Sequence, residues 1–466
     1  MPLIFPSNTL SAGGFSVDNS LRWNDGDSPY LSRVNGTPTN ADKWTFSIWV
    51  KRGALGSEQK LIAVEGDSLN NDAISFDSSD QLRWYGITSS STYMDVKTNR
   101  VFRDPSAWMH LCFIYDSGQG TDSDRAKIYV NGTQETSFAT ETYPDQDEDS
   151  YINKASKTTI IGRQSWAASG YFDGYMAEVT FCDGQAYAPD GNFGEFNEDT
   201  PTVFQPIDVS GLTFGTNGFY LDFEDSTNLG NDANGGTDFT ATNLAAIDQC
   251  TDSPTNNFAT FNPLFPVSGD TLSEGNVKVQ TSDGNYSPSS SSIGVASGKW
   301  YAEVKYTAQS SASALIVGVT SNPNEDARND EYIGEQSYSY GYNSSNGESY
   351  TGGTGSSYGD SFAVGDILGI TLNLDDNELI FYKNGTVQNS GTALSITAAA
   401  STTSGFYYFA VSDTTTNYNI TAEINFGNPS FSISSGNADA DGYGNFEYAV
   451  PSGYYALCTK NLAEYG

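Results

Sequence analysis

Residues 367–386 read ILGITLNLDDNELIFYKNGT, and this stretch decides the fold class. Its first half alternates large apolar residues with small or polar ones, which is the period-two pattern of a half-buried strand, at Leu368, Ile370, Leu372 and Leu374. Its second half is another apolar run that ends in Asn-Gly, the dipeptide that best tolerates positive φ at both positions of a tight hairpin turn. The stretch therefore predicts neighbouring antiparallel strands.

The same local pattern recurs elsewhere in the chain. KIYVNGT at 127–133 is a second strand that ends in Asn-Gly, and it follows the apolar strand HLCFIYD at 110–116. Period-two alternation also marks 44–51, 300–306 and 420–426, whereas no window of a dozen residues keeps a helical period. We therefore expect an all-β protein of two antiparallel, jelly-roll-like β-sandwich domains joined by an extended connector.

Proline and phenylalanine mark the boundary between the two domains. Residues 253–266, SPTNNFATFNPLFP, lack alternation and read as an extended segment that docks through Phe258, Phe261 and Phe265. The predicted organisation is an N-terminal arm, a first sandwich with an acidic C-terminal extension, a connector, a second sandwich and a C-terminal strap, at 1–14, 15–252, 253–270, 271–430 and 431–466.

Charge and composition exclude several classes of function. The 466 residues carry a formal net charge of −36, which argues against nucleic acid or an anionic membrane as partner. The single histidine, His110, rules out sites with two or three histidine ligands. The N-terminus does not read as a secretory signal, and we expect the four cysteines to be free, buried thiols of a protein made in a reducing cytosol.

Specific motifs add a resemblance to known families. WTFSIWVKRG (44–53), WMHLCFIYD (108–116) and FDGYMAEVTFCDGQA (172–186) resemble the laminin-G/concanavalin-like sandwiches. GKWYAEVKY (298–306), the segment 362–385 and ITAEINFG (420–427) resemble a SPRY domain. The linking motifs are similar to those of marine tailed-bacteriophage virion proteins, at 217–244, 252–263 and 453–462.

The resemblance implies a function without catalysis. It indicates a virion structural protein, namely a fibre, spike or capsid appendage, that binds a host-surface glycan or protein and contacts other virion proteins. The protein would be made in the host cytoplasm and located in the virion, and a homotrimer is one possible assembly. The alternative is a purely architectural assembly or decoration protein with no host contact.

A glycoside hydrolase is the less favoured enzymatic alternative. Retaining glycoside hydrolases of the concanavalin-like fold place the acid and the nucleophile on one strand, in the pattern Glu-x-Asp-x-x-Glu. This spacing does not occur in the chain. The nearest acidic strand holds Asp222 and Glu224 on one face. His110 lies between Met109 and Leu111 in an apolar strand, so we interpret it as a packed, hydrogen-bonded core residue.

An acidic stretch is a candidate calcium site. No Lys or Arg occurs between Arg163 and Lys278, while this stretch carries 17 Asp or Glu. Glycines separate several oxygen-bearing side chains there, and calcium prefers such ligands on a flexible loop; the candidates are Asp222, Asp225, Asp232 and Asp238, with Asn228 and Asn234 nearby. A solvated acidic loop is the other interpretation.

Exposed aromatic residues would serve glycan or protein recognition. Tyr and Trp stack on sugar faces and also offer polar atoms. Five tyrosines alternate with Ser, Gly and Asn in the segment 337–359, which we expect to be a long loop or a pair of edge strands: Tyr338, Tyr340, Tyr342, Tyr350 and Tyr358. Trp84, Tyr85 and Trp166 are weaker candidates in the first domain. The same alternation also fits strand residues that face a core.

Overall fold

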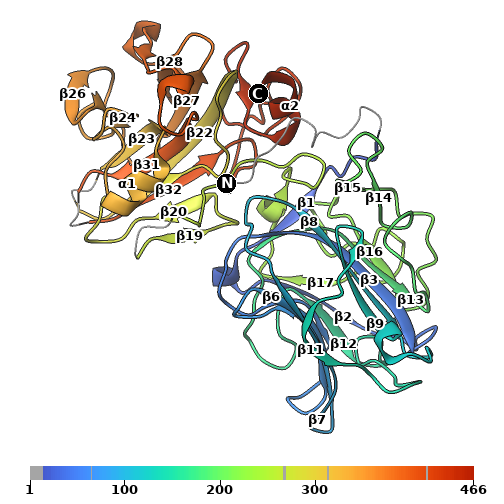
Figure 1. Cartoon of the computed structure of the whole chain (residues 1–466). Helices are drawn as coiled ribbons and strands as arrows, with labels where there is room; N and C mark the ends of the chain where they lie inside the picture. Colours follow the sequence, from blue (N-terminus) through green and yellow to red (C-terminus); the bar gives the residue numbers. More distant parts are fainter. Residues whose placement is uncertain (1–13, 65, 266–268, 312–313, 416–417) are drawn as a thin grey trace. The chain divides into compact units, whose positions relative to one another are not determined.

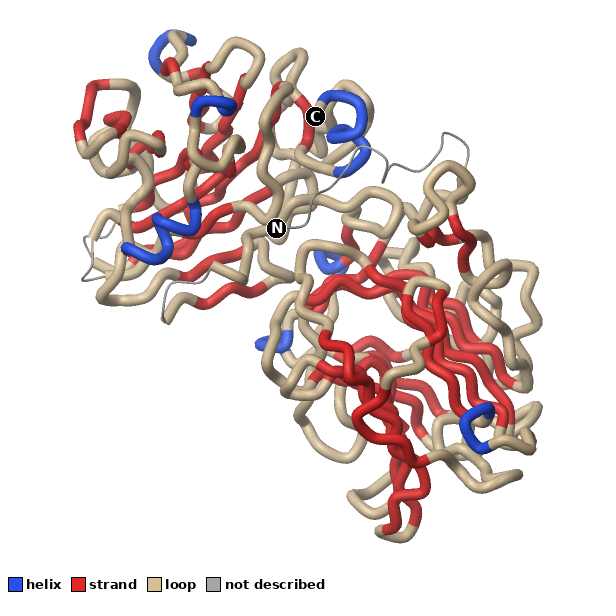
Figure 2. Tube along the Cα trace, in the orientation of Figure 1, coloured by secondary structure: helices blue, strands red, loops and turns tan. Residues whose placement is uncertain are grey.

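The computed structural model describes residues 14–64, 66–265, 269–311, 314–415 and 418–466 (Figure 1). The described chain forms two compact units that divide between Thr255 and Asn256. Antiparallel strands build both units, and the helices are short (Figure 2), so the predicted all-β fold class is confirmed. No helix of the described segments is long and apolar enough to span a bilayer.

Two eight-stranded sheets form the sandwich of the first unit. The first sheet has the order β10-β9-β8-β3-β13-β1-β18, and β16 also pairs with β13: β10 (Thr133–Gln134), β9 (Ala126–Val130), β8 (Met109–Asp116), β3 (Lys43–Arg52), β13 (Gly174–Asp183), β1 (Ser20–Trp23), β18 (Gln249–Cys250) and β16 (Phe219–Leu221). The second has the order β11-β7-β6-β5-β4-β12-β2-β17: β11 (Phe138–Thr142), β7 (Ser91–Val101), β6 (Gln81–Thr88), β5 (Asn71–Phe76), β4 (Gln59–Val64), β12 (Thr158–Ile161), β2 (Tyr30–Val34) and β17 (Thr240–Thr242).

Alternation along β3 explains how these sheets pack. Phe46, Ile48 and Val50 point into the space between the sheets and are fully buried. Trp49, on the opposite face, is buried as well, because it packs against Phe204 of the small hairpin formed by β14 (Gly194–Phe196) and β15 (Phe204–Pro206). Residues after β13 therefore add a second, smaller apolar layer outside the sheet.

The acidic extension completes the first sandwich. Its short strands lengthen both sheets, since β16 pairs with β13, β17 pairs with β2, and β18 pairs with β1. Period-two reasoning from the sequence did not predict these pairings.

The second unit is another two-sheet sandwich. Its nine-stranded sheet has the order β19-β20-β32-β22-β27-β28-β29, with β30 on β28 and β33 on β22: β19 (Thr271–Ser273), β20 (Lys278–Gln280), β32 (Ile420–Asn425), β22 (Lys299–Gln309), β27 (Ile367–Asn373), β28 (Glu378–Lys383), β29 (Thr386–Val387), β30 (Leu394–Ser395) and β33 (Tyr455–Ala456). The six-stranded sheet has the order β21-β31-β23-β24-β25-β26: β21 (Ser289–Ser290), β31 (Tyr408–Asp413), β23 (Leu315–Thr320), β24 (Ser339–Asn343), β25 (Glu348–Thr351) and β26 (Thr354–Ser357). The helices are α1 (Pro323–Asn329) and α2 (Thr459–Tyr465).

Both Asn-Gly turns form as predicted. Asn131 and Gly132 have φ angles of 47° and 74° between β9 and β10, and Asn384 and Gly385 have 47° and 75° between β28 and β29. These positive angles match the right-handed twist of the flanking strands. The segment 337–359 forms β24, β25 and β26 at one edge of the six-stranded sheet.

The division between units falls inside the predicted connector, 253–270. Phe258 and Phe261 are buried in the second unit, as predicted for docking residues, whereas Phe265 is half-buried. The predicted N-terminal arm lies outside the described residues except for Gly14. The C-terminal strap docks on the second unit, where β33 pairs in parallel with β22.

Candidate binding site

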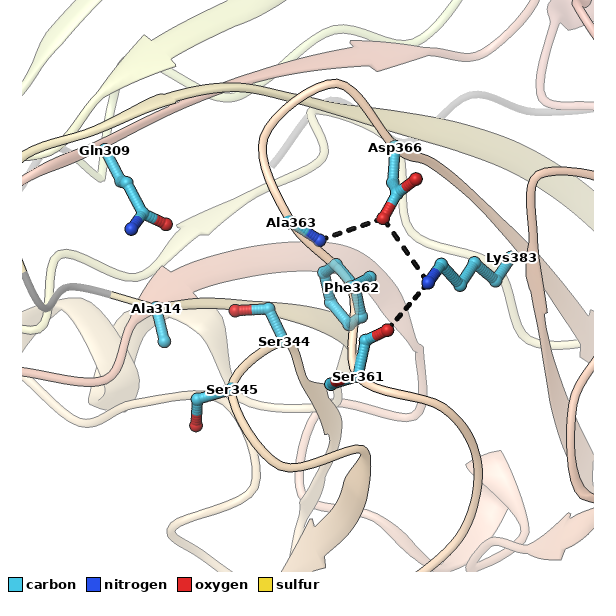
Figure 3. Close-up of a pocket in the computed structure, with 9 residues that line it drawn as sticks. All are labelled: Gln309, Ala314, Ser344, Ser345, Ser361, Phe362, Ala363, Asp366 and Lys383. Carbon is cyan, nitrogen blue, oxygen red and sulfur yellow. Dashed lines mark hydrogen bonds and ion pairs between the residues drawn. The ribbon is translucent and has the colours of Figure 1, made fainter.

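A pocket of about 520 Å³ opens in the second unit (Figure 3). Five separate segments supply its walls: the end of β22, the residue before β23, the turn after β24, the loop before β27 and the end of β28. The lining residues are Gln309, Ala314, Ser344, Ser345, Ser361, Phe362, Ala363, Asp366 and Lys383. The pocket therefore depends on the tertiary fold and not on one continuous motif.

A buried aromatic ring fixes the centre of the pocket. Phe362 is 5% exposed, and its ring lies 5.2 Å from the ring of Tyr342 and 6.4 Å from that of Tyr306. The Phe362 amide donates to the Ser344 carbonyl at 3.0 Å, which ties the loop before β27 to the turn after β24. Figure 3 shows the charged pair Asp366 and Lys383 on one side of this ring and Ser344 with Gln309 on the other.

Hydrogen bonds hold the charged side of the pocket in place. Lys383 Nζ donates to the Ser361 carbonyl at 2.7 Å and lies 3.5 Å from Asp366 Oδ2. Asp366 also accepts the Ala363 amide at 2.9 Å and Asn384 Nδ2 at 2.7 Å. Burial raises the pKa of Asp366, but these hydrogen bonds and the lysine outweigh burial and leave the pKa below its usual value, so this carboxylate stays ionised.

The amide and hydroxyl side of the pocket is also oriented by neighbours. Gln309 Oε1 accepts the Tyr306 hydroxyl at 2.7 Å, and Gln309 Nε2 donates to the Ser311 carbonyl at 3.2 Å. Ser345 Oγ donates to Asn343 Oδ1 at 2.9 Å. The lining set has no histidine or cysteine. Its three hydroxyls, one amide and one ion pair around an aromatic floor suit reversible binding of a polar ligand.

The structure corrects the expectation of five exposed tyrosines in the second domain. Tyr340, Tyr342 and Tyr358 are at most 7% exposed: β24 turns the first two into the core, and Tyr358, which follows β26, packs in the same core cluster. Tyr342 stacks on Phe381 at 5.2 Å, and Tyr358 Oη accepts the Phe381 amide. Tyr338 and Tyr350 keep partly exposed side chains, so a binding role remains a prediction for these two.

The aromatic candidates of the first domain also divide into buried and exposed residues. Trp84 is fully buried between the sheets, 5.2 Å from Trp44, so the expectation of surface exposure is wrong for it. Tyr85 is 9% exposed on the outer face of β6, where Lys60 and Arg83 lie over its ring. Trp166 is 48% exposed. Of these three, Trp166 alone offers a large open aromatic surface.

The four carboxylates proposed for calcium already have partners, and for three of them these lie within the acidic extension itself. Among the described residues, no group of three or more His, Cys, Asp or Glu is arranged to hold a metal ion. Asp232 lies 3.3 Å from Arg33, whereas Asp238 accepts the Asp232 amide and Asn228 Nδ2. Asp225 accepts from Thr227, and Asp222 accepts the amide of Glu224. These contacts satisfy the loop internally, which corrects the predicted calcium site.

His110 is a core residue, as predicted. It is fully buried, its Nε2 lies 2.8 Å from Ser47 Oγ, and its ring packs 5.1 Å from both Trp49 and Phe204. Burial lowers its pKa to about 3, so it stays neutral at physiological pH. The four cysteines are free and buried, again as predicted.

Glu178 is a buried acid that the sequence did not single out. It occupies a bulge of β13 with a φ of 51°, and its Oε2 accepts the Tyr220 hydroxyl at 2.7 Å. Burial raises its pKa to about 8 against the opposing effect of Tyr220, with Asp222 and Glu224 adding repulsion. Glu178 is only 6% exposed and thus not open to a large substrate, whereas Glu224 is exposed.

Sequence reasoning also missed the pocket residues Gln309, Ser344, Asp366 and Lys383. Two of these residues could have been found from the sequence, because Asp366 and Lys383 lie at the start and the end of the strand pair 367–383 that decides the fold. Pairing of β22 with β27, and the packing of the sheet that holds β24 against this sheet, were needed to bring the other two beside them.

Comparison with known families fits the two-sandwich architecture. Residues 25–188 match the laminin-G-type model of the concanavalin A-like lectin/glucanases superfamily, and residues 299–429 match the SPRY domain model. The chain carries a concanavalin-like domain followed by a SPRY domain. No curated protein sequence matches the chain significantly.

Solved structures resemble parts of the chain. The SPRY domain of human HERC1 is 20% identical, covers 35% of this chain and 96% of its own, and has a TM-score of 0.29. A SAP-like pentraxin from Limulus polyphemus is 15% identical over 37% of this chain and 80% of its own, with a TM-score of 0.28. A Bacteroides ovatus protein described as carbohydrate binding is 16% identical over 49% of this chain and 59% of its own, with a TM-score of 0.33. Similarities at this level carry no conclusion about function.

Proposed function

We propose that this chain is a non-enzymatic recognition protein that binds a glycan or a protein segment through the pocket of its SPRY domain. The observation that carries the proposal is the pocket itself, with three hydroxyls, one amide and one ion pair arranged around the ring of Phe362. Ligand sites typically combine a few oriented polar groups with an apolar floor. The hydrogen bonds of Gln309, Asp366 and Lys383 orient these groups in advance, which reduces the entropy lost on binding.

We further propose that the protein belongs to a bacteriophage particle and contacts the host surface. The support is the resemblance of the linking motifs, together with how two of them pack. The Asn257 amide donates to Thr459 Oγ1 at 3.0 Å, and the Thr459 amide donates to the Asn257 carbonyl at 2.9 Å. The segments 252–263 and 453–462 lie far apart in the sequence, but they pair with each other in the fold at Phe258 and Cys458. This pairing joins the two ends of the SPRY unit.

Competition for adsorption tests the proposal. The purified chain is added to host cells before the particles, and the fraction of particles adsorbed is measured. A Gln309→Ala, Lys383→Met double variant removes one polar group from each side of the pocket, and Lys299→Met is the control because Lys299 pairs with Asp376 away from the pocket. We expect the wild type and the control to reduce adsorption and the double variant to have lost most of this effect.

Each alternative function has its own outcome in the same experiment. A purely architectural protein would bind to particles and not compete for cells, whatever its oligomeric state. A glycoside hydrolase would release reducing sugar from host polysaccharide, and Glu224→Gln would abolish that release.

A further inference from the structure

A second surface of the SPRY unit combines aromatic rings with uncompensated negative charge. Its members come from the segment that follows α1 and from two flanking segments. We define the tyrosine–carboxylate surface as Tyr286, Tyr332, Tyr338, Tyr350, Asp330, Glu331 and Glu335; the neighbouring Asp326 of α1 is a buried carboxylate.

The loop after α1 is fixed on the outer face of the six-stranded sheet. Ile333 is fully buried against Ile316 of β23 and Ala410 of β31, and its amide donates to Ser412 Oγ at 3.0 Å. Glu335 Oε2 accepts the Tyr332 amide at 3.2 Å. The loop therefore presents its tyrosine and glutamates from a rigid base and not from a free segment.

The aromatic rings of this surface meet edge to face. Tyr332 lies 5.3 Å from Tyr286 and 6.3 Å from Tyr350, measured between ring centroids, and all three are partly exposed. Edge-to-face contacts leave part of each ring face available to another group. Tyrosine faces attract cations through the ring quadrupole.

The carboxylates have no cation to balance them. Of the described lysines and arginines, none lies within ion-pair distance of Asp326, Asp330, Glu331 or Glu335; the neighbouring Arg328 pairs with Glu325 instead. Asp326 is 1% exposed, its Oδ2 accepts the Thr320 hydroxyl at 2.5 Å, and its Oδ1 has no hydrogen-bond partner.

Repulsion between neighbouring carboxylates contributes to raised pKa values at Asp326 and Glu335. Burial and the charges of Glu331 and Glu335 raise the pKa of Asp326 to about 7, against the hydrogen bonds of Thr320 and Tyr338. Burial also raises the pKa of Glu335 against the hydrogen bond from the Tyr332 amide, and repulsion from Glu331 and Asp330 adds to the rise. A bound cation would offset the mutual repulsion of Asp330, Glu331 and Glu335.

We propose that the tyrosine–carboxylate surface binds an arginine side chain of a basic peptide segment of a partner protein. The guanidinium group is planar, donates from a fixed fork to carboxylates and stacks on aromatic rings, so it matches every component of this surface. A lysine ammonium would use the charge but not the stacking geometry.

This surface is distinct from the pocket. The pocket lies beside Phe362 between the two sheets, whereas Ile333 and its loop cover the outer face of one sheet. Its test is therefore independent of the proposed function, and either can fail alone.

Peptide binding to the full chain tests the proposal. The probe is a fluorescein-labelled peptide Gly-Ser-Arg-Gly-Ser-Arg-Gly, compared by fluorescence anisotropy with the same peptide carrying citrulline, the uncharged analogue of arginine. We expect the arginine peptide to bind at least tenfold more tightly. Glu331→Gln with Glu335→Gln should weaken binding about tenfold, and Tyr332→Leu should weaken it whereas Tyr332→Phe should not.

Two controls separate this surface from the general acidity of the chain. Asp145→Asn with Asp147→Asn removes the same number of charges from an exposed loop of the first unit, between β11 and β12, and should leave binding unchanged. Thermal melting of each variant verifies folding. Equal binding of the arginine and citrulline peptides, equal loss in the two double variants, or tighter binding of phosphocholine than of the peptide would overturn the proposal.

Discussion

Replacing Phe258 with alanine should destabilise the whole SPRY unit. Phe258 is 1% exposed and packs in one cluster with Tyr301, Phe446 and Cys458. A Cβ atom placed on Gly427 would lie 2.4 Å from the Phe258 ring, so backbone packs directly on this ring and cannot readily fill a void. Phe-to-Ala changes at such sites cost about 3–5 kcal/mol, which corresponds to roughly 10 °C in melting temperature for a unit of this size.

Differential scanning calorimetry of the full chain measures this effect. The matched control is Leu264→Ala in the same segment, because Leu264 is 51% exposed and its truncation should change stability by at most about 0.5 kcal/mol. Phe258→Leu keeps most of the volume and should lie between the two. A Phe258→Ala melting curve that matches the Leu264→Ala curve would show that residues 256–261 are only a linker and would refute the reasoning.

Three further predictions concern the remaining corrected or newly found residues. Tyr342→Ala should unfold the second unit, whereas Tyr338→Ala should leave its circular dichroism and melting temperature nearly unchanged, because only Tyr342 is in the core. Added calcium and EDTA should both leave the melting temperature unchanged, because Asp232 is already paired with Arg33; a calcium-dependent rise would restore the calcium site. Burial raises the pKa of Glu178 from 4.5 to about 8, so the folded state holds this proton more tightly than the unfolded chain does. The stability that this proton contributes is complete below about pH 4.5 and is lost as the pH rises through 8. In the wild type, the free energy of unfolding of the first unit, measured by urea titration, should therefore fall by up to about 4 kcal/mol between pH 5 and pH 9. In Glu178→Gln this fall should be absent or much smaller.

Much of the fold follows from local patterns that the sequence shows directly. Period-two alternation and the two Asn-Gly turns are properties of a few neighbouring residues, so they predicted the strands 367–373 and 378–383 and the turns that follow. The burial of His110 was also readable, since Trp108 and Cys112, which share its face of the strand, are apolar.

The expected exposure of Tyr340 and Tyr342 was wrong because alternation does not say which face of a strand meets solvent. Tyr340 and Tyr342 follow the same spacing as Tyr338, yet β24 places the first two against the core. Only the pairing of β24 with β23 on one side and β25 on the other decides this.

Long-range partners explain the remaining differences. Asp232 pairs with Arg33, which lies 199 residues away in the sequence, and no spacing within the acidic extension indicates that contact. The pocket likewise joins Gln309 to Lys383 across several strands. The sequence indicated which types of side chain could bind a ligand, but the three-dimensional fold determines which of these side chains are exposed to one.

The proposed function requires the SPRY pocket to bind a ligand on the cell surface. The most direct measurement is binding of the fluorescently labelled full chain to host cells, with Gln309→Ala, Lys383→Met compared against the control Lys299→Met. We expect saturable binding by the wild type and the control, and at least a tenfold weaker signal for the double variant with an unchanged melting temperature. Equal binding by all three proteins, or no binding by any of them, would contradict it.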